Sequence, residues 1–292
     1  MPELPEVETI KRGLEDSLKG QTIKEVEILW SRSMPIDRLD IEKLIIDTKV
    51  INIRRRGKVL IIDLSSEYSL LIHLKMTGQV VLDTPKSQDG SRFGGGHPTK
   101  SLMAKLPDNS TRVIIDLSRG HRLFFNDQRK FGWIKLIKTK DIDKQQLLRS
   151  MGPEPLDKNY TLDSFSSSLR KTSRAIKAAI LDQSVIAGVG NIYADESLHM
   201  AKIHPLRKAN SLSSTEIERL YSAIPLIMET SLNYGGTSFT NYVNANGLKG
   251  NYLDNARVFR REGELCDECG GIITKIRVAG RGTHLCSNCQ TI

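Results

Sequence analysis

All four cysteines lie in the last 27 residues, as two Cys-x2-Cys pairs: Cys266 with Cys269, and Cys286 with Cys289. Sixteen residues separate the pairs, a spacing typical of a zinc ribbon. Two disulfides are the alternative, but they need an oxidising compartment, and the acidic N-terminus lacks a signal-peptide pattern. A catalytic zinc would keep one coordination position open, whereas four thiolates close the shell. We therefore expect one structural Zn²⁺ ion.

The segment between the two pairs is expected to form a small β-hairpin. Residues 272–278 alternate like a strand, and residues 280–283 supply the turn before His284 returns to the second pair. Because this hairpin is too short to bury a core of its own, the metal would hold it together.

Pro2 is a second candidate for chemistry. Met1 is normally removed before a small residue, which would leave Pro2 as a free secondary amine. An α-amino group titrates near 7.7–8.0, so about a tenth of it is unprotonated at pH 7. Such an amine can form an iminium with a sugar aldehyde carbon, and Glu3 beside it could relay protons. The simpler alternative is that Pro2 and Pro5 only stiffen a leader before a helix.

Three further segments could line a DNA-binding cleft. The basic run Arg54 to Lys58 could present Lys58 to a phosphate, or could be a solvated basic turn. In residues 126–133, basic side chains surround Phe131 and could wedge into a base stack, although a core Phe beside a surface Arg is the alternative. In residues 185–193, glycines lead into a helix N-terminus, which can bind an anion through backbone N–H groups. A Gly-x-Gly pattern alone is a weak signal.

The composition agrees with a polyanion as partner. The chain has 292 residues, 43 Lys and Arg against 34 Asp and Glu, and a net charge of +9. Such a surplus favours nucleic acid through counterion release, but it does not separate a binding module from an enzyme. The chain contains no apolar run near the roughly 18–20 residues of a membrane helix. We expect a cytoplasmic protein that binds no membrane.

Two kinds of element must position these residues. A helix is expected over 6–18, with Gly20 as its stop, followed to about residue 138 by many short strands. Residues 83–100 are interpreted as a long mobile loop. Further helices are expected over 162–171, 173–181, 191–199 and 214–232, and Pro225 should kink or split the last one.

The fold class expected from this pattern is α+β. We expect a β-sandwich with a leading helix over 1–138, a linker over 139–152, a helical domain over 153–256 and a zinc hairpin over 257–292.

Taken together, these motifs resemble the formamidopyrimidine-DNA glycosylase family, bacterial base-excision enzymes for oxidised purines. The similarity runs from residue 2 to residue 289, and its motifs are residues 2–9, 56–58, 73–78, 127–132, 188–194, 280–283 and the four cysteines. The resemblance implies a helix–two-turn–helix domain before the zinc hairpin. It also implies a monomer that acts at the bacterial nucleoid on double-stranded DNA with oxidised purines or abasic sites.

The resemblance assigns roles to individual residues. Pro2 would attack C1′ of the damaged nucleotide, Glu3 would shuttle protons, and Lys58 would contact phosphate and assist the lyase steps. Arg281 would grip phosphate and donate a proton during elimination, and residues 237–252 would close over the everted base. The other implied DNA contacts are His73, His97, Lys177, Gly190, Asn191 and Tyr193, with Met76, Arg129 and Phe131 filling the void left by the flipped base.

The implied reaction is base removal through a Schiff base, followed by β- and δ-elimination. Two positions depart from the family pattern: Lys75 stands where a small residue is common, and Lys130 where Arg is frequent. Two alternatives remain. Endonuclease VIII shares the fold and the proline chemistry but prefers oxidised pyrimidines, and a protein of this fold could also bind DNA without catalysis.

Overall fold

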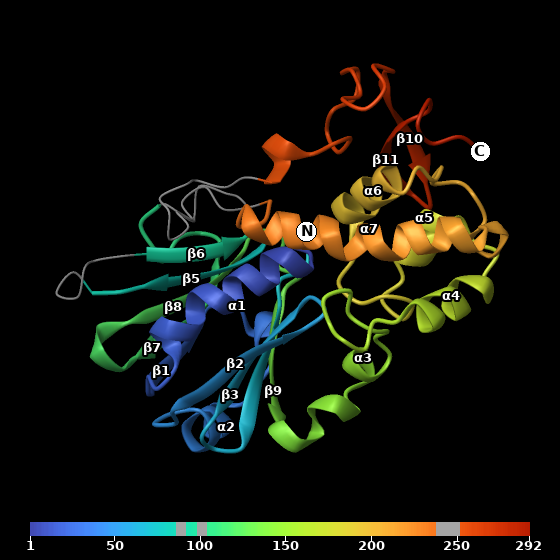
Figure 1. The fold of residues 1–292 in the computed structure, drawn as a ribbon. Helices are drawn as coiled ribbons and strands as arrows, with labels where there is room; N and C mark the ends of the chain where they lie inside the picture. Colours follow the sequence, from blue (N-terminus) through green and yellow to red (C-terminus); the bar gives the residue numbers. More distant parts are fainter. Residues whose placement is uncertain (86–91, 98–103, 238–251) are drawn as a thin grey trace. The chain divides into compact units, whose positions relative to one another are not determined.

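The computed structural model describes residues 1–85, 92–97, 104–237 and 252–292. The chain divides into two compact units (Figure 1). The first comprises Met1–Arg149 with Gly235–Gly250, and the second comprises Ser150–Tyr234 with Asn251–Ile292. In the described part of the chain, no helix is both long and apolar enough to cross a membrane.

The first unit contains two antiparallel sheets. The five-stranded sheet has the order β1-β7-β8-β5-β6, and the four-stranded sheet has the order β2-β3-β4-β9. The strands of the first are β1 Ile23–Ile28, β5 Gly78–Asp83, β6 Arg92–Gly96, β7 Thr111–Leu117 and β8 Arg122–Asp127, and those of the second are β2 Val50–Arg56, β3 Val59–Leu64, β4 Tyr68–His73 and β9 Trp133–Lys138.

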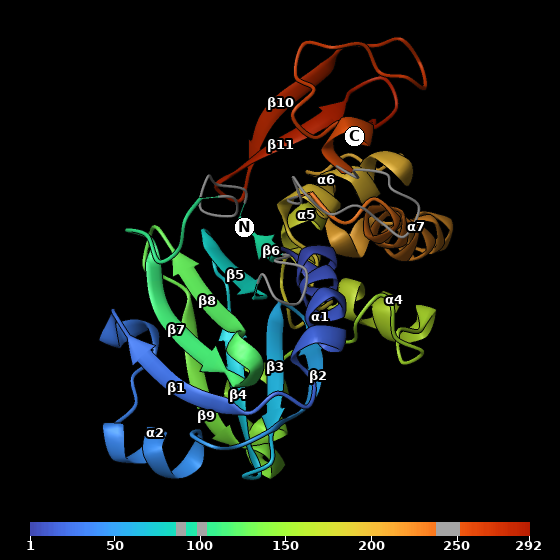
Figure 2. The same ribbon diagram turned by 90° about the vertical axis from the view of Figure 1, so that its left-hand side faces the viewer.

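Helix α1 (Leu4–Leu18) packs against β2 and β6, which are edge strands of the two different sheets (Figure 2). Its buried face carries Val7, Ile10, Leu14 and Leu18, which join apolar residues of both sheets in one core. Strands from both sheets and one helix therefore share a single core, and the expected sandwich with a leading helix is confirmed.

The expected loop over 83–100 is wrong in part, because β6 pairs with β5 from Asp83↔Arg92 to Gln79↔Gly96. Glycine is rare in strands, which is why the Gly94–Gly96 run predicted a loop. At Gly96, φ is +122°, and an added Cβ would lie 2.4 Å from the Gly78 carbonyl oxygen. The close approach of two strands therefore requires glycine there.

Helical segments also occur where none was expected. Helix α2 (Arg38–Leu44) interrupts the strand-rich region and has no buried residue. In the segment 139–152, a 3₁₀ helix spans Thr139–Lys144 and α3 spans Gln146–Arg149.

The second unit is built on α4 (Leu162–Arg170), α5 (Ile176–Ile180), α6 (Asn191–Met200) and α7 (Ser214–Asn233). Ser213 and Glu216 form a capping box at the start of α7, which continues through Pro225 without a break. Its buried stripe runs from Ile217 and Ile224 on one side of the proline to Ile227 and Met228 on the other, so packing holds both halves in one helix. The expected splitting is therefore wrong.

The C-terminal hairpin pairs β10 (Ile273–Val278) with β11 (Arg281–Cys286). The turn is Ala279-Gly280, not 280–283 as expected, and both residues have positive φ, 48° and 77°. Two positive φ values suit the tight two-residue connection of a twisted hairpin. Arg281 is consequently the first residue of a strand and pairs with Val278.

Candidate active site and DNA-binding residues

Several of the expected site residues of the first unit gather at one end of its two sheets. The β2–β3 turn carries Lys58, and Val59 pairs with His73 at the end of β4. His73 in turn pairs with Trp133, the first residue of β9. In the other sheet, Gly78 at the start of β5 pairs with Asp127 at the end of β8. The short connections 74–77 and 128–132 join the sheets at this same end, where Met76, Arg129 and Phe131 lie.

Helix α1 points its N-terminus toward this end. Glu8 forms an ion pair with Arg55, near the end of β2, at 3.0 Å. Five residues later, Gly13 packs against the ring of Phe93, near the start of β6. The N-terminus of α1 therefore lies toward the end of the sheets that carries Lys58. Pro2 and Glu3, which precede the helix, are both buried. The Glu3 amide donates to Glu6 Oε2 at 2.8 Å and fixes the first turn.

His73 is held as a neutral ring. Burial, together with the nearby charges of Lys75 and Lys58, lowers its pKa to about 3. Its Nδ1 accepts the Lys75 N–H at 3.0 Å, so the proton of the neutral ring resides on Nε2. Nε2–H is thus available as a hydrogen-bond donor. Lys75 has φ of +51°, in the left-handed region that favours glycine.

The β8–β9 loop is organised by Asp127, which sequence reasoning placed in the motif without a role. The fully buried Asp127 carboxylate accepts N–H groups of Phe131 at 2.7 Å and Gly132 at 2.6 Å. It also accepts the hydroxyl of Thr77, and Thr77 Oγ1 accepts the Arg129 N–H at 3.0 Å. The loops bearing Met76 and Phe131 are therefore tied together.

This arrangement presents an aromatic side chain to solvent. Phe131 is 52% exposed and Met76 is 40% exposed, both high for such apolar residues. The Arg129 guanidinium lies 4.7 Å from the Phe131 ring centroid, and Lys130 Nζ lies 3.8 Å from that of Trp30. The alternative of a core Phe at position 131 is wrong.

His97 follows β6 directly, and its backbone N–H donates to the Gly78 carbonyl at 3.0 Å. This places it at the same end of the sandwich. Of the expected loop 237–252, residues 238–251 lie outside the described part. Thr237, within the first unit, donates from its N–H and its hydroxyl to Glu6 Oε1 at 2.9 and 3.0 Å.

In the second unit, the glycine-rich turn is shaped by Gln183. Its side chain accepts the Gly188 N–H and donates to the Val189 carbonyl, both at 2.9 Å. Gly190 is the N-cap of α6 and offers no side chain to its first turn. Asn191, the first residue of α6, donates to the Gly282 carbonyl of β11 at 3.0 Å. Helix α6 is thereby joined to the strand that begins with Arg281.

Two residues expected to contact DNA have fully buried side chains. Lys177 forms an ion pair with Asp195 at 2.6 Å and donates to Thr283 Oγ1 at 2.7 Å. The Tyr193 hydroxyl lies 2.6 Å from Ser231 Oγ. With no exposed surface, these side chains cannot reach a phosphate in this structure, and we do not retain them as direct contacts.

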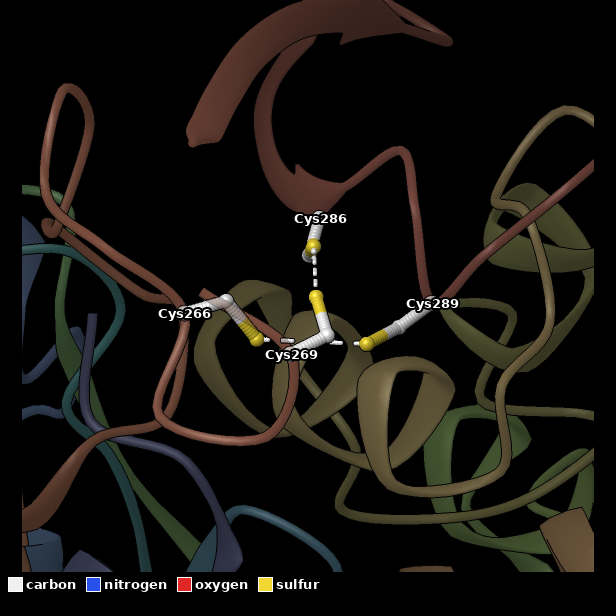
Figure 3. A group of neighbouring side chains, drawn as sticks. All are labelled: Cys266, Cys269, Cys286 and Cys289. Atoms are coloured by element: carbon white, nitrogen blue, oxygen red, sulfur yellow. Dashed lines mark hydrogen bonds between the residues drawn. The ribbon is translucent and has the colours of Figure 1, made fainter. Parts of the chain in front are cut away.

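The four cysteines form one cluster. Their Sγ atoms lie within 4.8 Å of one another, and all four are free thiols, which excludes the disulfide alternative (Figure 3). Zn–S bonds of about 2.3 Å in a tetrahedron separate sulfurs by roughly 3.8 Å. In the structure, the Sγ atoms of Cys266 and Cys289 lie 3.9 Å apart and those of Cys269 and Cys286 lie 3.4 Å apart. The donor set and its spacing therefore fit a structural zinc ion.

One contact at the cluster was missed by sequence reasoning. His199, in the last turn of α6, places Nε2 3.4 Å from Cys266 Sγ, and burial lowers the pKa of His199. A neutral ring that donates N–H to a thiolate is a common outer partner of a bound metal. The same helix thus carries Asn191 at one end and a contact to the zinc ligands at the other.

Family models match most of the chain. The model described as formamidopyrimidine-DNA glycosylase N-terminal domain covers residues 1–134, and the H2TH domain of the same enzyme covers residues 151–243. A zinc finger found in FPG and IleRS covers residues 263–292, in agreement with a structural zinc.

Relatives match along the whole length. A formamidopyrimidine-DNA glycosylase of Pelotomaculum thermopropionicum is 39% identical over 293 residues, covering 100% of both chains. One from Lactiplantibacillus plantarum is 39% identical, covering 98% of both. The solved complex of the Lactococcus lactis Fpg with an abasic site containing DNA superposes with a TM-score of 0.86 at 34% identity, covering 99% of this chain and 100% of that one. The chain therefore belongs to the formamidopyrimidine-DNA glycosylase family, the DNA glycosylases of base excision repair.

Proposed function

We propose that this chain excises oxidised purines, such as 8-oxoguanine and formamidopyrimidines, and then cleaves the DNA strand at the abasic site. The observation that carries the proposal is the joint placement of Glu3, Lys58 and a solvent-exposed Phe131 at the end of the sandwich toward which α1 directs Pro2. Relatives support the substrate class: one solved Lactococcus lactis Fpg complex contains a Fapy-dG lesion.

In the proposed reaction, the amine of Pro2 attacks C1′ of the damaged nucleotide after removal of Met1. The bond from C1′ to the base breaks, and the base departs with the proton that the Pro2 nitrogen loses. Glu3 protonates the sugar ring oxygen, so that the ring opens and C1′ becomes an iminium carbon bonded to Pro2. Loss of a C2′ proton then expels the 3′ phosphate, and a second elimination expels the 5′ phosphate. Water then hydrolyses the iminium, which frees the Pro2 amine and releases the sugar fragment, and a one-nucleotide gap with phosphates at both ends remains.

Other residues would hold the substrate. Met76, Arg129 and Phe131 would fill the space of the flipped nucleotide and offset a few kcal/mol of unstacking. Lys58, His73 and His97 would bind phosphates on the first unit, and Asn191, Gly190 and Arg281 on the second. Zinc would act through structure, because the cluster holds the strand that begins at Arg281.

A substrate panel tests the specificity. Duplexes with 8-oxoguanine opposite C, thymine glycol opposite A, or an abasic site are incubated with the protein, and the products are resolved by gel. We expect fastest cleavage of the 8-oxoguanine strand and ends that both carry phosphate. Faster cleavage of thymine glycol would instead favour the endonuclease VIII specificity. Binding without any cleavage of the abasic strand would favour a non-enzymatic protein.

A further inference from the structure

A groove in the second unit has a cationic residue that the proposed contacts do not use. Its volume is about 400 Å³, and its lining includes Asn191, Phe259, Arg260, Glu262, Lys275 and Gly282. Asn191 brings the N-terminus of α6 to this groove, and a helix N-terminus favours anions. The acidic side chain in this lining is Glu262, and its charge is offset by Lys275, whose Nζ lies 3.7 Å from the Glu262 carboxylate.

Arg260 has an unfavourable backbone conformation. Its φ is +65°, in the left-handed region that costs a non-glycine residue about 1 kcal/mol. The surrounding turn enforces this value. The buried Glu196 carboxylate accepts the backbone N–H groups of residues 257, 258 and 259 at 2.8, 3.0 and 2.8 Å. On the other side, the Arg261 N–H donates to the Val258 carbonyl at 3.1 Å. Glycine would fit here without strain.

The three arginines of this turn differ in their partners. Arg257 forms an ion pair with Glu268 at 2.7 Å, and Arg261 forms one with Asp267 at 2.6 Å. For the exposed Arg260, no ion pair exists with any residue in the described ranges, and its guanidinium lies 5.9 Å from the centroid of the Phe259 ring. A strained position therefore carries a cation that the fold itself does not neutralise.

We infer that Arg260 binds a backbone phosphate of duplex DNA in this groove, beside the phosphate proposed for Asn191. The guanidinium matches the geometry of phosphate oxygens and can donate two parallel hydrogen bonds. The bound phosphate would supply the negative charge that pairs with Arg260. A role of this arginine in binding would also account for a strained residue where glycine would fit without strain. This inference rests on the proposed function, because it takes DNA as the ligand of the second unit.

The test compares Arg260→Gly with the charge-matched control Arg38→Gln. Arg38 is exposed on α2, ahead of the start of β2 and so at the far end of that strand from Lys58. Binding of a duplex containing a stable abasic-site analogue is measured by fluorescence anisotropy between about 0.05 and 0.3 M salt. One lost phosphate contact should reduce the slope of log K against log salt by about 0.9, which corresponds to roughly eightfold weaker binding at ~0.1 M.

We expect Arg260→Gly to melt at the wild-type temperature or above it, because strain is relieved, and yet to bind DNA more weakly with the reduced slope. Arg38→Gln should keep the wild-type slope. A folded Arg260→Gly protein with wild-type affinity and slope would overturn the inference, as would an equal effect of both variants. Covalent trapping of the wild type is scored separately, so failure of the proposed chemistry remains distinguishable from failure of the Arg260 contact.

Discussion

At the scale of single residues, the site depends on side chains whose charge is set by burial. His73 is the clearest case, because its neighbours are cations and its ring is almost fully enclosed. A positively charged His73 would repel Lys58 and Lys75. The ring therefore remains neutral where an exposed histidine would begin to titrate, and it can donate one hydrogen bond from a fixed nitrogen.

This gives a prediction about acid stability. Above pH 6.5 His73 is neutral in both states, but between pH 6.5 and about 3 only the unfolded chain takes up the proton. The stability contributed by His73 is therefore fully present above pH 6.5 and is lost as pH falls. From pH 6.5 to pH 5 the free energy of unfolding should fall by about 2 kcal/mol, because one pH unit corresponds to about 1.36 kcal/mol for one proton. Urea unfolding of wild type and His73→Gln at several pH values measures it. The variant should show the shallower pH dependence, and parallel curves would refute the assignment.

At the scale of elements, α6 connects the features of the second unit. Asn191 opens the helix and bonds to β11, Asp195 in its middle pairs with Lys177, and His199 contacts Cys266 near its end. Asp195 also accepts the backbone N–H of His284 at 2.9 Å. Helix α6 therefore links the cysteine cluster, through His199, to the Asn191 end that we propose to bind phosphate.

We expect His199→Phe to weaken zinc binding by at least about tenfold, because the aromatic ring keeps its volume but loses the N–H donor to the thiolate. Competition with a chromophoric chelator measures zinc affinity directly, without reference to activity. His204→Phe is the matched control, since His204 is also buried in this unit and contacts the Leu206 N–H instead of a cysteine. Equal zinc affinity of the His199 variant and wild type would show that the contact has no effect on the metal.

Elements with a local signature could be predicted from the sequence, and elements fixed by distant contacts could not. Helices α1 and α4 begin and end within a few residues of their expected bounds, because caps and apolar periodicity are encoded locally. Strand β6 was missed since only its pairing with β5 makes three glycines a strand. Likewise, the Cys spacing predicted the metal cluster, whereas the roles of Asp127 and His199 depend on partners far along the chain, Thr77 and Cys266.

At the scale of the whole molecule, the effect of the net charge of +9 depends on which basic side chains are paired within the protein and which are exposed. Several basic side chains form ion pairs with acidic residues of the same chain: Arg55 pairs with Glu8, Arg54 with Asp63 and Lys177 with Asp195. Others, including Arg129, Arg260 and Arg281, are exposed in the two units. The chain belongs to a family of DNA glycosylases, and the exposed cations in each unit support our proposal that both units bind DNA.

The central claim is that Pro2 is the nucleophile, and borohydride trapping on an 8-oxoguanine duplex tests it most directly. Borohydride reduces the iminium between Pro2 and C1′ to a stable amine, so protein and DNA become covalently joined. We expect a trapped complex with wild type whose DNA-bearing peptide begins at residue 2, and at least about a hundredfold less trapping with Pro2→Gly. Absence of a complex with wild type, undiminished trapping with Pro2→Gly, or attachment of the DNA at a lysine would contradict the account.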